Sequence, residues 1–202
     1  MLTSLFYSII NALIPPRAHE AVVESLTLED LEMLRREASL PYHEPAITAL
    51  VWEIKYKANK KALALAGALL AEELLGVAEE ELGKPLLVPI PMHPERRHAR
   101  GYNQTELLCE AALKCGVQDA YEYAPDFLAR IQNTAPQQTL ARTKRLINVK
   151  NSMRATDPQK IKGRVCVVVD DVSTTGATLA EAARALRQAG ARRVHTLALA
   201  RS

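Results

Sequence analysis

The strongest pattern of hydrophobic positions lies near the C-terminal end of the chain. Residues 165–169 are four valines and a cysteine, and this apolar run predicts a strand buried on both faces of a parallel sheet. Two acids and a hydroxyl-rich stretch follow. Apolar positions then return at one-face helical spacing between Leu179 and Leu186, and Gly190 supplies a stop. The pattern predicts a buried strand, a polar turn and a helix.

Residues 2–14 also carry apolar positions at helical spacing, and Pro15 and Pro16 end the segment. Its apolar face packs either on the chain's own core or on a partner or membrane surface. The segment lacks a positively charged leading region and a small-residue cleavage site, and it is too short to span a bilayer. We therefore expect a docking helix in a cytoplasmic protein that has no membrane span.

Three further helices are predicted before the next strand. Thr27 followed by Asp30 resembles a capping box, which opens a short acidic helix over residues 28–38. Another helix is predicted over residues 46–54. The segment from there to about residue 81 is rich in Ala, Leu and Glu, which are strong helix formers. This last helix is expected to be the first that covers the sheet.

Residues 86–91 predict a strand whose end is forced out of the ladder by proline. A loop predicted over residues 92–104 concentrates three arginines and two histidines. Asn103 and Glu106 then cap a helix that stops at Gly116. A strand end, a basic loop and a helix start together predict an anion site.

Residues 127–156 contain no acidic residue and carry several arginines and lysines. A short helix is predicted around residues 140–146, and the last strand over residues 194–199. The basic segment fits three interpretations: a lid over a polyphosphate, a strip that faces nucleic acid, or a solvated basic face. The sequence leaves these three open.

Composition places these elements in one ordinary α/β domain with an appendage. The chain has 202 residues, of which 48% are apolar, enough for a sizeable core. The formal net charge of +3 and the pI near 8.8 suit a phosphate ligand without requiring nucleic acid. Cys109, Cys115 and Cys166 form no Cys-x-x-Cys pair, so we expect buried or incidental thiols in a reducing compartment.

The candidate chemistry lies between the buried strand and its helix. Residues 173–178 can direct backbone N–H groups, hydroxyls and a helix N-terminus at one anion, and Gly176 permits close approach or positive φ. Asp170 and Asp171 would repel that phosphate, so they must face something else. Ribose hydroxyls, directly or through a magnesium shell, are natural partners for paired acids. Neither Gly-x-x-x-x-Gly-Lys-Ser/Thr nor Gly-x-Gly-x-x-Gly occurs in the chain.

Residues 167–178 resemble the phosphoribosyl pyrophosphate signature of type I phosphoribosyltransferases. Further motifs, in order along the chain from about residue 15 to its end, are similar to those of the narrower ComF family. They are Lys55-Tyr56-Lys57, Pro89-Ile90-Pro91, Arg96 with Arg100-Gly101-Tyr102-Asn103-Gln104, Arg130 with Thr134-Ala135-Pro136-Gln137, and Arg145 with Asn148. The Arg-Gly-Tyr-Asn-Gln and Thr-x-Pro-Gln elements are not shared by phosphoribosyltransferases at large.

The resemblance implies an α/β fold of the type I phosphoribosyltransferase kind, a mainly parallel sheet flanked by helices with an N-terminal helical extension. Residues 1–45 would be the helical appendage and residues 46–202 the phosphoribosyltransferase-like domain. Relatives carry a zinc module with Cys-x-x-Cys pairs in the appendage, whereas this chain has alanines at Ala18 and Ala21. Because His19 and His43 cannot supply four ligands, no zinc is expected.

The resemblance also implies Mg²⁺-dependent binding of phosphoribosyl pyrophosphate or a related ribose phosphate, and it leaves open whether the phosphoribosyl group is transferred to an acceptor. The acids would hold the ribose or a ligand-borne Mg²⁺, residues 173–178 the 5′-phosphate, and two arginines with Mg²⁺ the leaving pyrophosphate. Residues 130–145 would form a lid. The residues with an expected catalytic role are Asp170, Asp171, Arg96 and Arg100. The residues expected to bind substrate are Val172, Ser173, Thr174, Thr175, Gly176, Ala177, Thr178, Lys55, Tyr56, Lys57, Asn103, Gln104 and Arg130.

Two other functions compete with the transferase. The chain could be a non-catalytic competence or DNA-uptake factor that binds single-stranded DNA or a helicase-like partner, which would explain the basic segment and the Lys-Tyr-Lys motif. Asp170 and Asp171 weigh against this alternative, because they would repel a nucleic-acid backbone. A third alternative is a regulator that binds phosphoribosyl pyrophosphate without consuming it. A homodimer is expected by fold-level analogy alone.

Overall fold

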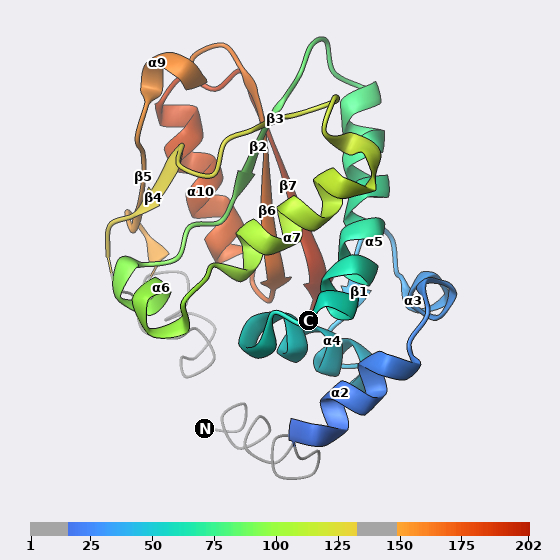
Figure 1. The fold of residues 1–202 in the computed structure, drawn as a ribbon. Coiled ribbons are helices and arrows are strands. Elements are labelled where there is room, and N and C mark those ends of the chain that lie inside the picture. Colours follow the sequence, from blue (N-terminus) through green and yellow to red (C-terminus); the bar gives the residue numbers. More distant parts are fainter. Residues whose placement is uncertain (1–15, 133–148) are drawn as a thin grey trace.

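The computed structural model describes residues 16–132 and 149–202 of the chain (Figure 1). The helices predicted over residues 2–14 and around 140–146, and the motif residues between 134 and 148, lie outside these residues. The division of the chain at residue 45 stays a prediction.

The described residues build a five-stranded parallel sheet in the order β1-β7-β6-β2-β3 (Figure 1). Strand β6 lies at its centre, and its first seven residues are all buried, as the unbroken apolar run predicts. The strands are β1 (Leu40–Pro41), β2 (Leu86–Pro89), β3 (Glu122–Tyr123), β6 (Val165–Ser173) and β7 (Arg193–Arg201). The predicted α/β fold with a mainly parallel sheet is therefore confirmed.

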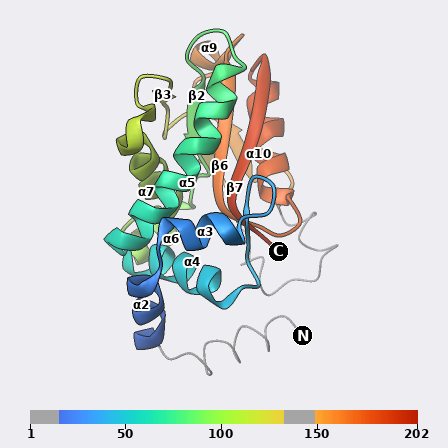
Figure 2. The same cartoon turned by 90° about the vertical axis from the view of Figure 1, so that its right-hand side faces the viewer.

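Helices cover both faces of this sheet. Figures 1 and 2 show α5 and α7 on one face and α10 on the other. The helices are α2 (Pro16–Ser25), α3 (Leu28–Leu34), α4 (Pro45–Lys57), α5 (Lys60–Glu79), α6 (Pro94–Arg100), α7 (Gln104–Ala112), α9 (Pro158–Ile161) and α10 (Ala177–Gln188), and a π-helical turn (Leu113–Val117) continues α7. Within the described part of the chain, none of these helices is long and apolar enough to cross a membrane.

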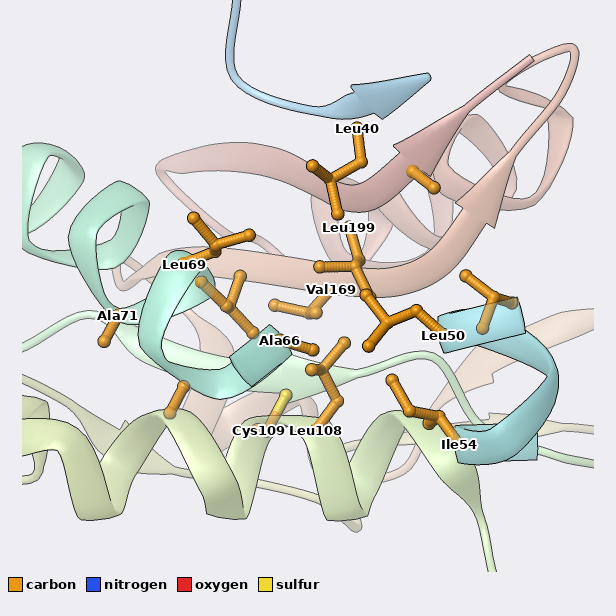
Figure 3. Close-up of a cluster of buried hydrophobic side chains, with 14 of the residues drawn as sticks. Leu40, Leu50, Ile54, Ala66, Leu69, Ala71, Leu108, Cys109, Val169 and Leu199 are labelled. Atoms are coloured by element: carbon orange, nitrogen blue, oxygen red, sulfur yellow. The ribbon is translucent and has the colours of Figure 1, made fainter. Parts of the chain in front are cut away.

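The alternation of side chains along β6 divides the core in two. Val167 and Val169 belong to the larger cluster, which joins the sheet to α4, α5 and α7 (Figure 3). Cys166 and Val168 belong to the second cluster, beneath α10 and the antiparallel pair of β4 (Leu128–Arg130) and β5 (Met153–Ala155). Successive side chains of a strand point to opposite faces, so one short sequence supplies both cores.

The contact between α5 and α7 is unusually close at Gly67. A Cβ atom added to Gly67 would lie 2.7 Å from the Cβ of Ala111 and 2.8 Å from its carbonyl carbon. Because Gly67 has no side chain, α5 and α7 can pack this closely. The position of α7 in turn places the loop of residues 101–103, which precedes it, at the edge of the sheet.

A separate antiparallel pair, β4 (Leu128–Arg130) and β5 (Met153–Ala155), packs against α10. Two side chains of α10 hold β5 by its backbone: the Met153 N–H donates to Glu181 Oε1 at 3.2 Å, and Arg184 Nη2 donates to the Met153 carbonyl at 3.2 Å. Glu181 and Arg184 also pair with each other at 2.7 Å. This pair of side chains fixes the strand that lies beside Arg130.

Two features of the N-terminal part of the fold differ from the sequence predictions. The acidic helix begins with the predicted Thr27 and Asp30 capping box but ends at Leu34, not at residue 38. The chain then turns through Glu37, whose φ is 51°, and pairs Arg36 with Ser39 before it enters β1. Strand β1 was not predicted at all, because a pair of residues carries no readable alternation.

The segment predicted as a basic loop contains a helix, α6. His93 caps it by accepting a hydrogen bond from the Glu95 N–H, Pro94 stands at its first position, and Gly101 with φ of 88° ends it. The acid pair also lies inside β6 and not after it, because β7 continues the ladder as far as Ser173. The arginines of α6 and the two acids therefore stand on regular elements.

Candidate functional site

The candidate site lies at the carboxyl edge of the sheet. Strands β2 and β6 end there side by side, and Figure 1 shows α4 and α6 beyond these strand ends. Open α/β sheets bind ligands at this edge. Asp170 and Asp171 occupy it from β6, with 7% and 4% of their surfaces exposed.

The backbone satisfies one oxygen of each acid. The Asp171 N–H donates to Asp170 Oδ1 at 2.9 Å, and the Val172 N–H donates to Asp171 Oδ1 at 2.7 Å. The other oxygen of Asp171, Oδ2, is buried and accepts no hydrogen bond within the described residues. An unsatisfied buried acceptor is costly unless a ligand supplies the donor. Carboxylate oxygens fit both a ribose hydroxyl and a magnesium shell, so the site fits the groups that the sequence predicts.

Two cations compensate the acids from different elements. Lys55 of α4 places its Nζ 3.3 Å from Asp171 Oδ2. Burial alone would lower the pKa of the Lys55 amine, but Asp171 and Asp170 raise it above its usual value. Arg130 of β4 donates from Nε to the Pro91 carbonyl at 3.1 Å. Burial lowers the pKa of Arg130, nearby Asp170 opposes that shift, and Arg96 adds to it. Both cations therefore stand close to the acid pair.

Asp170 remains under-compensated in spite of these cations. Burial, followed by repulsion from Asp171, raises the pKa of the Asp170 carboxyl to about 8, and Lys55 and Arg130 offset only part of this. Burial and a neighbouring acid at a strand end are features that recur at functional sites.

The predicted phosphate-binding segment follows directly. Val172 and Ser173 are the last residues of β6, Thr174 to Gly176 form the turn, and α10 begins at Ala177. Gly176 has φ of 73°, and a Cβ atom added to it would meet nothing within 4 Å. The turn is therefore open on this side, and the N-terminus of a twelve-residue helix faces it. Thr178, which lies in the first turn of α10, is half-buried.

The structure separates the two arginines that were expected to bind pyrophosphate. Arg96 lies near Arg130 and is half-buried. The Arg100 guanidinium lies 5.3 Å from the centre of the Tyr56 ring, and its Nη1 donates to Gln104 Oε1 at 2.6 Å. Arg96 thus lies near the second cation of the site, Arg130, whereas Arg100 and Gln104 fix α6 to the helices beside it.

Asn103 is a buried anchor of the same edge. Its Oδ1 accepts from the Thr105 N–H at 3.2 Å and caps α7, and its Nδ2 donates to the Ile90 carbonyl at 3.0 Å, just beyond β2. Tyr102, which the sequence analysis did not propose as a site residue, donates from its hydroxyl to the Lys55 carbonyl at 3.0 Å. The Arg-Gly-Tyr-Asn-Gln motif was the available signal for Tyr102. Its residues join α4, α7 and the end of β2.

The rest of the Lys-Tyr-Lys motif lies nearer to solvent. Tyr56 is 50% exposed and its ring centre lies 5.3 Å from that of Trp52, whose own ring contacts buried His19 at 4.8 Å. Lys57 is exposed. Trp52 was not proposed from the sequence, although its spacing of four residues from Tyr56 places both on one helix face. Lys55 alone of the motif contacts the acid pair.

A parallel sheet with an acid pair and an open, glycine-containing turn at its carboxyl edge defines a phosphoribosyltransferase-like protein. The family model for the phosphoribosyl transferase domain matches residues 113–202. The DNA utilization protein YhgH of Salmonella typhi is 31% identical over 193 residues, covering 93% of this chain and 81% of that protein. Competence protein ComFC of Bacillus subtilis is 36% identical over 105 residues, which are 52% of this chain and 39% of ComFC. The chain belongs to the ComF family, as predicted.

Solved structures also resemble the chain. The hypoxanthine phosphoribosyltransferase of Trypanosoma cruzi, complexed with the product IMP, matches with 12% identity and a TM-score of 0.44 over 69% of this chain and 64% of that one.

Proposed function

We propose that this protein binds phosphoribosyl pyrophosphate in a Mg²⁺-dependent manner at the carboxyl edge of its sheet and transfers the phosphoribosyl group to an acceptor. The observation that carries the proposal is Asp171 Oδ2, a buried oxygen beside a second acid that accepts no hydrogen bond within the described residues. A ribose hydroxyl would supply the missing donor. The open turn at Gly176 stands on the same strand end and would take the 5′-phosphate.

Different residues would hold different parts of the ligand. Asp170 and Asp171 would hold the ribose, the turn after β6 the 5′-phosphate, and Arg96 and Arg130 the pyrophosphate. When the bond from C1 to pyrophosphate breaks, negative charge grows on the leaving group and positive charge on the sugar ring, and cations fixed beforehand stabilise the former. Mg²⁺ bound with the ligand beside the acid pair would neutralise part of the charge on the departing pyrophosphate. The acceptor then forms the new bond to C1.

Calorimetric titration with phosphoribosyl pyrophosphate, with and without Mg²⁺, tests this proposal. Wild type is expected to bind in the presence of Mg²⁺, and Asp171→Asn to bind at least about tenfold more weakly. Unchanged affinity in Asp171→Asn would refute the site. A pyrophosphate-release assay on the same sample separates a transferase from a protein that binds the ligand without consuming it.

A second candidate function rests on the Tyr56 surface. Its ring is half exposed and lies beside Arg100 and exposed Lys57, a combination that suits stacking and backbone contacts with single-stranded DNA. The relatives' names, DNA utilization protein and competence protein, favour it as well. In this role the protein would act in the cytoplasm with a helicase-like partner or as a homodimer.

Oligonucleotide binding measured at about 50 mM and about 200 mM salt tests the second candidate. A steep loss of affinity with salt and a further loss in Tyr56→Ala would support it. Lys162→Ala is the control, because Lys162 is exposed but precedes β6, at the amino edge of the sheet. Equal effects of Tyr56→Ala and Lys162→Ala would refute a dedicated DNA surface.

A further inference from the structure

The Lys55 ammonium lies closer to the acid pair than the proposed function requires. Lys55 Nζ lies 3.3 Å from Asp171 Oδ2, and the two side chains are only 15% and 6% exposed. Lys57, two residues further along α4, is exposed to solvent. The last turn of α4 therefore carries one lysine that lies in the site, Lys55, and one that is exposed to solvent, Lys57.

The backbone of Lys55 is held in place independently of its side chain. The Tyr102 hydroxyl donates to the Lys55 carbonyl at 3.0 Å. The helix then ends at Ala58, where φ is 47° and the N–H closes back on the Glu53 carbonyl. Because Tyr102 belongs to the segment between α6 and α7, the position of Lys55 is fixed from outside its own helix. Such fixation limits the entropy lost when the ammonium engages a ligand.

The ion pair between Lys55 and Asp171 compensates the negative charge and still leaves Asp171 Oδ2 available to accept a hydrogen bond from a ligand. Lys55 Nζ and Asp171 Oδ2 are 3.3 Å apart, which is within ion-pair range but longer than a charge-assisted hydrogen bond, and Oδ2 has no other partner within the described residues. Coulomb attraction depends on distance, whereas a hydrogen bond also needs direction. A sugar hydroxyl can therefore donate to Oδ2 while the lysine still balances the carboxylate.

We propose that Lys55 is the resident cation of the acid pair, so that the ribose half of the site binds ribose 5-phosphate without a divalent metal. Mg²⁺ is then needed only for the pyrophosphate of the full ligand, which brings additional negative charge. This inference rests on the proposed function and deepens it, because it assigns the metal requirement to one half of the ligand.

Calorimetric titration of the full chain with ribose 5-phosphate, in EDTA and in Mg²⁺, tests the inference. Wild-type affinity is expected to differ by less than about threefold between the two conditions. Lys55→Ala should bind at least about tenfold more weakly in EDTA and recover most of that loss in Mg²⁺, which can replace the missing charge. Lys55→Arg keeps a cation and should stay within about threefold of wild type in EDTA.

Lys162→Ala is the control, since it removes an exposed lysine at the amino edge of the sheet, away from the site, and it should bind as wild type does. Circular dichroism melting shows that each variant is folded; Lys55→Met, which keeps the apolar stem, replaces Lys55→Ala if the latter fails to fold. Equal affinities of wild type and the uncharged variant in EDTA would overturn the inference, as would a wild type that needs Mg²⁺ for ribose 5-phosphate. Failure of wild type to bind either ligand in any condition would refute the proposed function itself.

Discussion

Each edge of the sheet holds a carboxylate with little exposed side-chain surface, and the surroundings shift the pKa values of the two carboxylates in opposite directions. At the amino edge, Glu81 has a side chain that is 3% exposed, and it lies 2.8 Å from His195 Nε2, 2.7 Å from Arg193 Nη1 and 3.2 Å from Arg192 Nη2. The His195 contact first, and then Arg193, hold the pKa of Glu81 below its usual value. At the carboxyl edge, Asp170 shares its surroundings with a second acid, and its pKa is raised.

The difference indicates which edge serves the fold and which serves a ligand. Several partners satisfy the Glu81 carboxylate, so it joins the end of α5 to the start of β7. Asp170 is buried beside a second acid, and the nearby cations offset only part of this, an arrangement that costs stability and that a ligand can relieve. Stability is therefore concentrated at one edge and chemistry at the other.

Two glycines show the same contrast between a position that serves packing and a position that serves a ligand. Gly67 lies in the larger core, where an added Cβ atom would collide with Ala111 at 2.7 Å. Gly176 lies at the candidate phosphate turn, where an added Cβ atom would meet nothing within 4 Å. The first glycine is needed for packing between helices, and the second for its positive φ and for the open space beside it.

The largest expected effect on stability is that of Gly67→Ala. The new methyl would push α7 away from α5, and the overpacking is expected to cost about 3 kcal/mol of unfolding free energy. Urea denaturation measures this cost. Gly76→Ala is the control in the same helix, because an added Cβ atom there meets nothing within 4 Å, and it should not destabilise the protein. Equal stabilities of the two variants would refute the close helix contact.

Asp170→Asn is expected to stabilise the protein by a few kcal/mol near pH 8, because it removes a carboxylate whose ionisation is opposed by burial and by Asp171. A raised carboxyl pKa means that the folded protein binds more protons than the unfolded chain between the ordinary pKa, near 4, and the folded value of about 8. Wild-type stability therefore falls as the pH rises through this window, and the gain from Asp170→Asn should grow across it. Urea denaturation at about pH 5, 6.5 and 8 measures the trend.

Glu81→Gln is the matched variant at the amino edge, and it should act in the opposite direction. Because the folded-state pKa of Glu81 is lowered, its contribution to stability is present above the ordinary pKa and is lost as the pH falls through the folded value. Glu81→Gln should therefore lower stability at neutral pH and lose this effect in acid. The same sign for both variants would contradict the comparison of the two edges.

Arg96→Ala should weaken the binding of phosphoribosyl pyrophosphate about tenfold, or about 1.4 kcal/mol, because Arg96 lies near Arg130, with which it is proposed to bind the pyrophosphate. Arg100→Ala should change the affinity much less, since its guanidinium is directed to Tyr56 and Gln104. Calorimetry of the two variants side by side measures the difference. A larger effect of Arg100→Ala would reverse the assignment of the two arginines.

The smallest expected effect on stability is that of Gly176→Ala, about 1 kcal/mol, since only the positive φ resists the substitution. Its effect on ligand affinity should be larger than its effect on stability, because the methyl enters the space expected for the 5′-phosphate. Paired urea denaturation and titration separate the two. A variant that binds as wild type does would place the phosphate elsewhere.

The sheet and the acid-pair edge could be predicted from the sequence because the apolar run of a buried strand and the two acids are adjacent in β6. Its valines predict burial on both faces, and Asp170 to Thr178 follow without a break. Strand β1 could not be predicted, since two residues show no period, and α6 was hidden by its many arginines, although Pro94 and Gly101 marked its ends. The contact of Lys55 with Asp171 joins residues more than a hundred positions apart, and only the packing of α4 across the strand ends reveals it.

The most direct test of the central claim, that the carboxyl edge gives up stability for binding, is the unfolding free energy of wild type and Asp170→Asn, each with and without phosphoribosyl pyrophosphate and Mg²⁺ near pH 8. Without ligand, Asp170→Asn should be the more stable protein. With ligand at about one hundred times its dissociation constant, wild type should gain about 2.7 kcal/mol and Asp170→Asn much less. A less stable Asp170→Asn that gains as much from the ligand as wild type does would contradict the claim.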